Sequence, residues 1–497
     1  MNIVMTLEMA AECHPDRIAV SCDGRALSYA QLLRAARHAA GAIAASGCAY
    51  VGLLDVNSVA APVALYAAAY AGLPYVPLNF RLTAGEIGAL LARIAPAFLV
   101  ADRQLLAAVE VPAGVRVVGR DEFLALADAG EPHDAQADPS AVAVQLFTSG
   151  TTGAPKAALL RHENLMSYIL GTVEFGGAGE EEAALVAVPP YHIAGISAVL
   201  SSTYACRRMV QLANFDGRAW LELARGERVT QAFVVPTMLA RVVECIDRDG
   251  APGALPALRA LAYGGGKMPA PVIERAMQLW PQVDFTNAYG LTETSSTIAL
   301  LGPDEHRTGF GAQDPEVRRR LHSVGKPIGS VEIEIRGAEG QALQADEVGD
   351  VYVRGPQVAG EYLGAGSLLD ANGWFSTRDR GSLDRYGFLY LDGRADDVIV
   401  RGGENISPGE VEDVLRLHPG VADVAVVAVP DTQWGEAVGA VVVAAAGASP
   451  SVAELQDWVR QRLRSSRVPA QLRFRAELPH NEMGKILRRV LRDEFSS

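Results

Sequence analysis

Short apolar runs alternate with longer amphipathic stretches along the first part of the chain. Apolar runs bounded by turn residues predict strands at residues 18–22, 50–55, 75–78 and 97–101. Longer stretches between these runs, amphipathic at 5–12 and Ala-rich at 61–71, predict helices at residues 5–12, 30–46, 61–71, 84–94 and 121–129, with Ser28 as the cap of the second. Strand and helix in alternation at this spacing predict an α/β fold with a largely parallel sheet.

The pattern continues after residue 140, and there the strands end in polar residues or glycine. The predicted strands are at residues 141–147, 184–188, 228–235, 258–263 and 284–293. Because the carboxyl ends of parallel strands meet at one edge of a sheet, α/β proteins bind their ligands there. The sequence therefore predicts a ligand cleft along this edge.

The pattern changes twice toward the end of the chain. Short β-rich pieces at 331–336, 349–353 and 387–391 predict a small β-barrel-like subdomain. Residues 398–497 have their own alternation of strands and helices, including the apolar runs 424–429 and 438–446. We therefore predict a large N-terminal domain over residues 1–393, built of α/β subdomains and the barrel-like piece, and a small α+β C-terminal domain over 394–497.

Composition narrows the class of protein. At 497 residues, with 49% hydrophobic and 21% charged residues, the chain resembles a soluble enzyme of several subdomains. A formal net charge of −14 without a basic stripe argues against nucleic acid as the main partner. The N-terminus has no secretory signal and the apolar runs are too short for a membrane span, so we expect a cytoplasmic protein. The scattered cysteines agree with reduced thiols; they are Cys13, Cys22, Cys48, Cys206 and Cys245.

The stretch LFTSGTTGAPKA, residues 146–157, has the composition of a polyphosphate-binding loop. Its glycines let backbone N–H groups turn toward one point, and its hydroxyls and a lysine add donors there. A Walker A loop is excluded because, counted from Gly150, Pro155 replaces the second glycine and Ala157 replaces the hydroxyl after Lys156.

Five motifs in order make the chain similar to the adenylate-forming superfamily of acyl-CoA synthetases, luciferases and peptide-synthetase adenylation domains. They are TSGTTGAPK (148–156), YGLTE (289–293), GWFSTRDRG (373–381), GRADDVIVRGGENISPGEVE (393–412) and PHNEMGKILRR (479–489). The resemblance covers essentially the whole chain. It implies a mobile C-terminal domain and an active site between the two domains.

The resemblance also implies the reaction. A carboxylate attacks the α-phosphate of ATP to give acyl-AMP and pyrophosphate, and a nucleophile then displaces AMP. Negative charge gathers on oxygens in both steps, so donors, cations and Mg²⁺ are expected to dominate catalysis. The implied pyrophosphate-gripping residues are Thr148, Ser149, Gly150, Thr151, Thr152, Gly153 and Lys156.

Further roles follow from the resemblance, position by position. Thr292 is implied as an α-phosphate contact and Glu293 as the Mg²⁺ ligand, because a hard carboxylate oxygen suits this ion. Asp379 is implied to bind the ribose hydroxyls, with Arg394 near ribose or phosphate. The family usually has glycine before this aspartate, and here Arg378 replaces it. The adenine slot is expected at Gly264, Gly265, Gly266, Asn287, Ala288, Tyr289 and the adjoining Gly290.

The C-terminal domain carries the most specific expectation. Lys485 matches the family's catalytic lysine, which bridges the carboxylate and the α-phosphate, although a lysine so near the chain end also suits plain solvation. Asp396 is the expected hinge. Rotation there withdraws Lys485 and brings Gly402 and Gly403 to the site, where they leave room for a thiol arm.

The acceptor and the acid are less defined. The GGEN turn favours coenzyme A, while a carrier-protein thiol or an amine remains open as the acceptor. His192 is expected at the acyl site, in an apolar lining with residues 193–196 and 234–237 that suits a hydrophobic monocarboxylic acid; a core histidine is the alternative. Lys267 either reads a second carboxylate or is a solvated residue at a helix start. The oligomeric state is expected to be monomer or homodimer.

Two other classes of protein are less compatible with the sequence. A catalytically inactive relative that only binds or regulates is disfavoured by the presence of Lys485, Glu293 and Asp379. A kinase-type transferase is disfavoured because neither a Walker A loop nor a kinase glycine-rich loop is found. The products separate these classes, since an adenylating enzyme releases pyrophosphate and AMP whereas a kinase releases ADP.

Overall fold

The computed structural model describes residues 1–134, 138–148, 155–402, 404–481 and 486–495. The chain divides into two compact units. The first unit comprises Met1–Leu321, Gly325–Glu332 and Val353–Phe375, and the second comprises His322–Val324, Ile333–Tyr352 and Ser376–Ser497. The change of unit at Phe375 precedes residue 393, and the domain boundary expected there stays a prediction.

One sheet of the first unit runs in the order β15-β14-β13-β12-β11-β9-β10-β1-β2. Its strands are β1 (Ile18–Cys22), β2 (Arg25–Ser28), β9 (Ala183–Val186), β10 (Arg208–Gln211), β11 (Gln231–Val234), β12 (Ala260–Gly264), β13 (Asp284–Leu291), β14 (Ser296–Leu301) and β15 (Lys326–Pro327). Pairing is parallel from β13 to β1 and antiparallel at the two edges. This confirms the largely parallel α/β architecture that the sequence predicts.

A second sheet of the same unit has the order β19-β18-β8-β7-β4-β3-β5-β6. Its strands are β3 (Tyr50–Leu54), β4 (Tyr75–Pro77), β5 (Ala97–Ala101), β6 (Val115–Gly119), β7 (Val142–Thr148), β8 (Lys156–Arg161), β18 (Glu361–Tyr362) and β19 (Gly366–Ser367). Strand β8 was not anticipated, and it forms because residues 157–160 are apolar and buried against β7. The phosphate-loop motif therefore joins two antiparallel strands.

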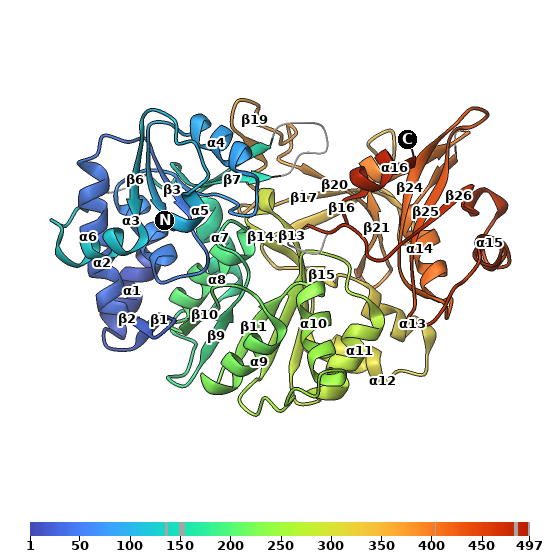
Figure 1. Ribbon diagram of the computed structural model, residues 1–497, viewed down its shortest axis with the longest axis horizontal. Helices are drawn as coiled ribbons and strands as arrows, with labels where there is room; N and C mark the ends of the chain where they lie inside the picture. The colour runs from blue at the N-terminus through green and yellow to red at the C-terminus, as the bar shows by residue number, and fades with distance from the viewer. Residues whose placement is uncertain (135–137, 149–154, 403, 482–485, 496–497) are drawn as a thin grey trace. The chain divides into compact units, whose positions relative to one another are not determined.

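Helices cover these sheets, and their capping follows the sequence. Ser28 accepts from the backbone N–H of Gln31, whose side chain bonds back to Ser28, so α2 begins with a capping box. Figure 1 shows α9, α10 and α11 (green) along the sheet that contains β11. The helices are α1 (Val4–Cys13), α2 (Tyr29–Ala44), α3 (Ala60–Tyr70), α4 (Ala84–Arg93), α5 (Arg103–Leu106), α6 (Arg120–Ala129), α7 (His162–Thr172), α8 (Ile193–Tyr204), α9 (Gly217–Gly226), α10 (Pro236–Asp247), α11 (Ala270–Leu279), α12 (Pro303–Gly311) and α13 (Pro315–Arg319).

A smaller sheet follows, in the order β16-β17-β20-β21. Its strands are β16 (Glu332–Arg336), β17 (Gly349–Arg354), β20 (Phe375–Leu383) and β21 (Leu389–Arg394). Strands β16, β17 and β21 overlap the three predicted β-rich pieces, whereas β20 was not predicted. Strands β20 and β21 pair antiparallel, with Asp379 opposite Arg394.

The last sheet explains why residues 424–429 are so apolar. It contains β22 (Ile399–Arg401), β23 (Glu404–Ile406), β24 (Val421–Asp431), β25 (Gly435–Ala444) and β26 (Gln471–Arg475). Val424 and Val426 pack in a cluster with residues of α14 (Pro408–Arg416) and α15 (Val452–Arg460). Val427 and its neighbours pack in another cluster with residues of α16 (Arg488–Phe495). Because alternate residues of a strand point to opposite faces, burial of both faces requires an unbroken apolar run.

No helix among the described residues is both long and apolar enough to cross a membrane.

Candidate functional site

The two ends of the phosphate-loop motif are held by the hairpin of β7 and β8. Thr148 and Lys156 are register partners, and the Thr148 hydroxyl donates to the Lys156 carbonyl at 3.5 Å. The Pro155 carbonyl accepts from Nη1 of Arg93 at 2.6 Å. The predicted residues Ser149, Gly150, Thr151, Thr152 and Gly153 lie outside the described residues.

Lys156 lies beside a tyrosine that connects it to Glu293. The Lys156 ammonium is 5.6 Å from the centroid of the Tyr362 ring, and the Tyr362 hydroxyl donates to Oε1 of Glu293. The structure thus brings together two residues that the sequence assigns to the nucleotide site and one that it does not. Tyr362 was missed because β18 is only two residues long and has no apolar alternation of its own.

Glu293 is carried by a braced turn. It lies in the 3₁₀ turn η1 (Thr292–Thr294), and its carbonyl accepts from the backbone N–H groups of Ala359 and Gly360 at 2.9 and 3.0 Å. The following Ser295 has φ +54°, a left-handed conformation that costs a non-glycine residue about 1–2 kcal/mol. The buried amide of Gln357 donates to the Thr294 carbonyl at 3.1 Å. These contacts fix Thr292 and Glu293 at the end of β13.

The expected adenine slot lies at the carboxyl ends of β12 and β13, which pair side by side. Gly264 is the register partner of Ala288, and a Cβ on Gly264 would collide with the Ala288 carbonyl. Gly265 has φ +81°, whereas a Cβ on Gly266 would meet only the Pro236 ring, at 3.8 Å or more. Gly264 is therefore required by a close backbone approach and Gly265 by its positive φ, whereas a Cβ on Gly266 would make only ordinary contacts. Asn287, Tyr289 and Gly290 complete β13 beside them.

His192 is the N-cap residue of α8, six positions after the last residue of β9, and its side chain makes no capping hydrogen bond. Burial, together with the charge of Arg81, lowers its pKa to about 3, so the imidazole is neutral near pH 7. Two other residues of the expected acyl lining, Gly195 and Ile196, border a largely apolar cavity with room for about one water molecule. The remaining lining residues are Asn57, Ala61, Leu65, Tyr75, Val186, Pro190, Val199 and Gln211.

The residues expected at the ribose lie in the second unit. Nε of Arg394 is 3.3 Å from Oδ1 of Asp379, and its Nη1 donates to the Thr377 carbonyl at 3.0 Å. Arg378 has φ +59°, a conformation that suits the glycine usual at this position. Its guanidinium is 3.9 Å from the carboxylate of Asp396, the expected hinge.

The hinge segment is also bound to α16. Asp396 belongs to the 3₁₀ turn η3 (Ala395–Asp397), and the next residue, Asp397, pairs with Arg492 at 3.0 Å and with Arg488 at 3.5 Å. Helix α16 begins three residues after Lys485, which lies outside the described residues. The polar contacts of this part of the chain therefore join the hinge to the helix that follows the predicted lysine.

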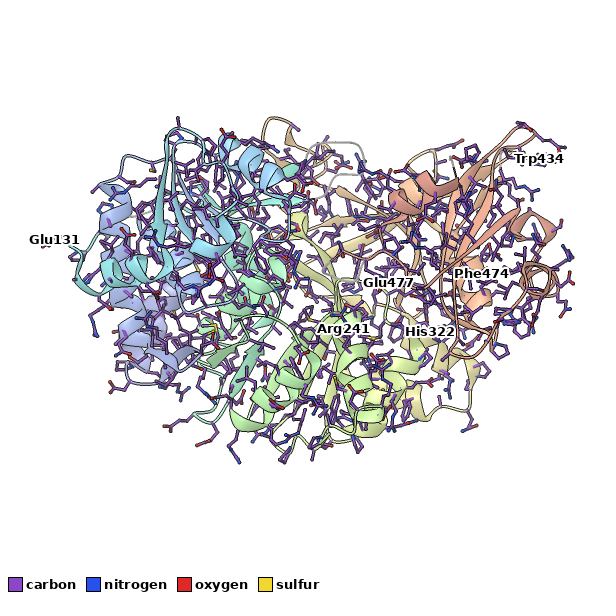
Figure 2. All side chains as sticks on the ribbon, viewed as in Figure 1. Glu131, Arg241, His322, Trp434, Phe474 and Glu477 are labelled. Carbon is purple, nitrogen blue, oxygen red and sulfur yellow. The ribbon has the colours of Figure 1, made fainter. Side chains whose placement is uncertain are left out.

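The glycine turn of the expected thiol passage is covered by an indole. Gly402 has φ +57° and donates its N–H to the Trp434 carbonyl at 2.9 Å, and a Cβ there would lie 2.6 Å from Cε3 of Trp434. The guanidinium of Arg401 lies 5.6 Å from the centroid of the same ring. Trp434 stands at the tip of the β24–β25 hairpin (Figure 2). Gly403 lies outside the described residues.

Comparison with known proteins gives matches along almost the whole chain. The profile of the AMP-binding enzyme family matches residues 7–363, and that of the AMP-binding enzyme C-terminal domain matches residues 410–485. A fatty acid–[acyl-carrier-protein] ligase from Streptomyces coeruleorubidus is 34% identical, over 99% of this chain and 96% of its own length. A 2-succinylbenzoate–CoA ligase from Geobacillus kaustophilus is also 34% identical, over 98% and 96%.

A solved structure agrees with these sequence matches. O-succinylbenzoate coenzyme A synthetase from Bacillus subtilis, in complex with ATP and a magnesium ion, has a TM-score of 0.82 and 30% identity over 99% of each chain. Its fold is thus shared along the length of this protein.

Proposed function

This chain belongs to the adenylate-forming superfamily of AMP-binding enzymes, and on that premise we propose that it activates a hydrophobic carboxylic acid with ATP. The acid becomes acyl-AMP with release of pyrophosphate, and the acyl group then passes to the thiol of coenzyme A. The enzyme is an AMP-forming acid–thiol ligase that uses ATP, Mg²⁺ and coenzyme A. The observation that carries this function is the grouping of Lys156, Tyr362 and Glu293 beside the phosphate loop, in a chain of this family.

The donor set of the first unit fits Mg²⁺. Glu293 offers a carboxylate with one oxygen engaged by a neutral phenol, and the described residues hold no cluster of His, Cys, Asp or Glu that could form an all-protein cage. Mg²⁺ typically binds through one or two carboxylates plus substrate phosphates, so this sparse set suits it. When bound, the ion would neutralise charge on the phosphate oxygens.

Different residues of the chain bind different parts of ATP in the adenylation step. Thr148, Lys156 and the phosphate loop hold the pyrophosphate, Thr292 contacts the α-phosphate, and Gly266 with Tyr289 borders the adenine. Asp379 accepts from the ribose hydroxyls, since a carboxylate is an acceptor suited to a vicinal diol. Its ion pair with Arg394 supports this role, because the pair orients the carboxylate.

Lys485 supplies the cation between the carboxylate of the acid and the α-phosphate, and Asp396 is the hinge. After adenylation, rotation at Asp396 withdraws Lys485 and presents the turn at Gly402 and Gly403. Asp396 contacts Arg378 and Asp397 pairs with Arg492, so ion pairs help to set the conformation of the hinge segment. This arrangement supports a hinge at Asp396.

Coenzyme A is the acceptor that the turn sequence favours. The first alternative is a carrier-protein thiol, which agrees with the name of one relative. The second is an amine, which would give an amide. One assay separates the three, because each acceptor added to the preformed acyl-AMP gives a different product.

The acid is a monocarboxylic acid with an apolar body. The neutral His192 and the apolar side chains around Gly195 and Ile196 support this class. The exposed Lys267 would extend the range to dicarboxylic acids if it reads a second carboxylate. We place the enzyme in the cytoplasm, as a monomer or homodimer that binds no nucleic acid.

The decisive experiment measures pyrophosphate release over a panel of aliphatic and aromatic acids, with and without coenzyme A and amines. We expect pyrophosphate and AMP, in an acid-dependent reaction that a chelator abolishes. ADP as the product, or turnover that a chelator leaves unchanged, would overturn the assignment.

A further inference from the structure

Tyr362 occupies a place between two functional groups that come from distant parts of the chain. Its hydroxyl reaches Glu293 at the end of β13, and its ring faces the ammonium of Lys156 at the start of β8. The residue is half-buried, and Lys156 is exposed. A single side chain thus touches both the predicted metal ligand and the predicted phosphate ligand.

The backbone of Tyr362 is fixed from both sides. Tyr362 is the register partner of Ala158 in β8, and the next residue, Leu363, donates its N–H to the Ala157 carbonyl at 2.9 Å. The preceding Glu361 accepts from Nε and Nη2 of Arg161 at 2.8–3.0 Å. Upstream, the N–H groups of residues 359 and 360 bond to the carbonyl of Glu293. The tyrosine is therefore anchored to the same two elements that its side chain touches.

The chemistry of a phenol suits this position. A neutral donor on Oε1 of Glu293 fixes the plane of the carboxylate, keeps its negative charge and leaves Oε2 for a cation. The ring attracts the ammonium of Lys156 through its quadrupole without neutralising it, whereas a carboxylate in the same place would compete with phosphate.

We propose that Tyr362 is a positioning residue for nucleotide binding, orienting Glu293 toward the metal and Lys156 toward the phosphates. This role rests on the proposed function. It requires no proton transfer from the phenol, only its hydrogen bond and its ring face.

The test uses Tyr362→Phe, which keeps the ring and removes the hydroxyl. We expect the Mg²⁺ concentration for half-maximal pyrophosphate release to rise about 10–100-fold, the usual cost of losing a group that orients a metal ligand. The KM for the acid should change little, and supplied acyl-AMP should react with coenzyme A at the parent rate. Mn²⁺ binding in the presence of α,β-methylene-ATP, measured by water-proton relaxation, should weaken in parallel, and this readout needs no turnover.

Two controls separate orientation from loosening of the strand. Tyr168→Phe removes a phenol from α7 in the same unit and should change neither readout. Glu361→Gln weakens the anchor to Arg161 but leaves the phenol in place, so the metal dependence should shift far less than in Tyr362→Phe. An equal shift in Glu361→Gln would overturn the orienting role.

The ring is tested by Tyr362→Leu. This variant should show the weaker metal binding of Tyr362→Phe. In addition, we expect it to bind the ATP analogue more weakly in the absence of metal, because Lys156 loses its contact with the ring. Unchanged Mn²⁺ and nucleotide binding in both variants would overturn the proposal while leaving the function standing. A parent enzyme that releases no pyrophosphate with any acid would instead overturn the function, and the binding measurements would still decide the role of Tyr362.

Discussion

At the scale of the residue, Arg378 departs from the glycine that the family resemblance implies at this position. The sequence shows an arginine where glycine is usual, and the structure gives it φ +59°, the conformation for which glycine is suited. The side chain is exposed and its contact with Asp396 spans 3.9 Å. An exposed pair at this distance contributes little, so the backbone cost is not offset there.

We therefore expect Arg378→Gly to raise the free energy of unfolding by about 1 kcal/mol, because the left-handed conformation costs glycine nothing. Urea denaturation of the second unit's transition measures the change. Arg380→Gly, in β20 at a position without positive φ, is the matched control and should lower stability by about 0.5–1 kcal/mol. A loss of stability in both variants would show that the Arg378 side chain contributes more than its backbone costs.

Which site residues the sequence could predict depends on where their partners lie. Glu293 and Asp379 lie in contiguous motifs that carry the family resemblance, so their roles could be predicted before the fold was known, and they stay predictions. Tyr362 could not, because its role arises from pairing between β18 and β8, which are about two hundred residues apart in the chain. A strand of two residues that pairs with a distant strand shows no alternation of apolar and polar residues in the local sequence.

At the scale of the element, the strands and helices that the hydrophobic pattern predicts are present, but the buried strand β8 was not anticipated from it. The run at 424–429 is buried on both faces and was correctly assigned to a strand. The pattern was also silent on the four-residue helix α5, on β6, which is partly exposed, and on the two-residue strand β18. The turn after β22 is another local arrangement whose cause, the indole over Gly402, is visible only in the fold.

That turn yields a prediction. Gly402→Ala should lower the free energy of unfolding by about 1–3 kcal/mol, because its Cβ would lie 2.6 Å from the Trp434 ring at φ +57°. Thioester formation should fall more than acyl-AMP formation if the turn lines the thiol passage. The two half-reactions, assayed separately, measure this difference.

Gly435→Ala is the control, since Gly435 has φ +80° with nothing within 4 Å of an added Cβ. It carries the backbone cost without the collision, and both half-reactions should be kept. If Gly402→Ala and Gly435→Ala lowered the free energy of unfolding and thioester formation equally, the collision with Trp434 would not be the cause.

At the scale of the whole molecule, two half-reactions are expected to use different arrangements of one chain. Lys485→Ala should lower acyl-AMP formation by about 100–1,000-fold, because a charge contact in a desolvated site is worth roughly 3–4 kcal/mol. The same variant should convert supplied acyl-AMP with coenzyme A at nearly the parent rate. Single-turnover assays of each half measure this, and an equal fall in both would contradict rotation at Asp396.

The pairing of β18 with β8 also bears on how the protein is made. Until residues 361–367 have been synthesised, the edge of β8 has no partner, and an unpaired apolar edge can join another chain instead. Contacts of such long separation form late and slowly during folding. The Arg161–Glu361 pair beside this edge can form only after the 200 residues that separate its members have been added. Pairing of β18 with β8 therefore has two consequences: it brings Tyr362 to Glu293 and Lys156, and it covers a strand edge that could otherwise aggregate.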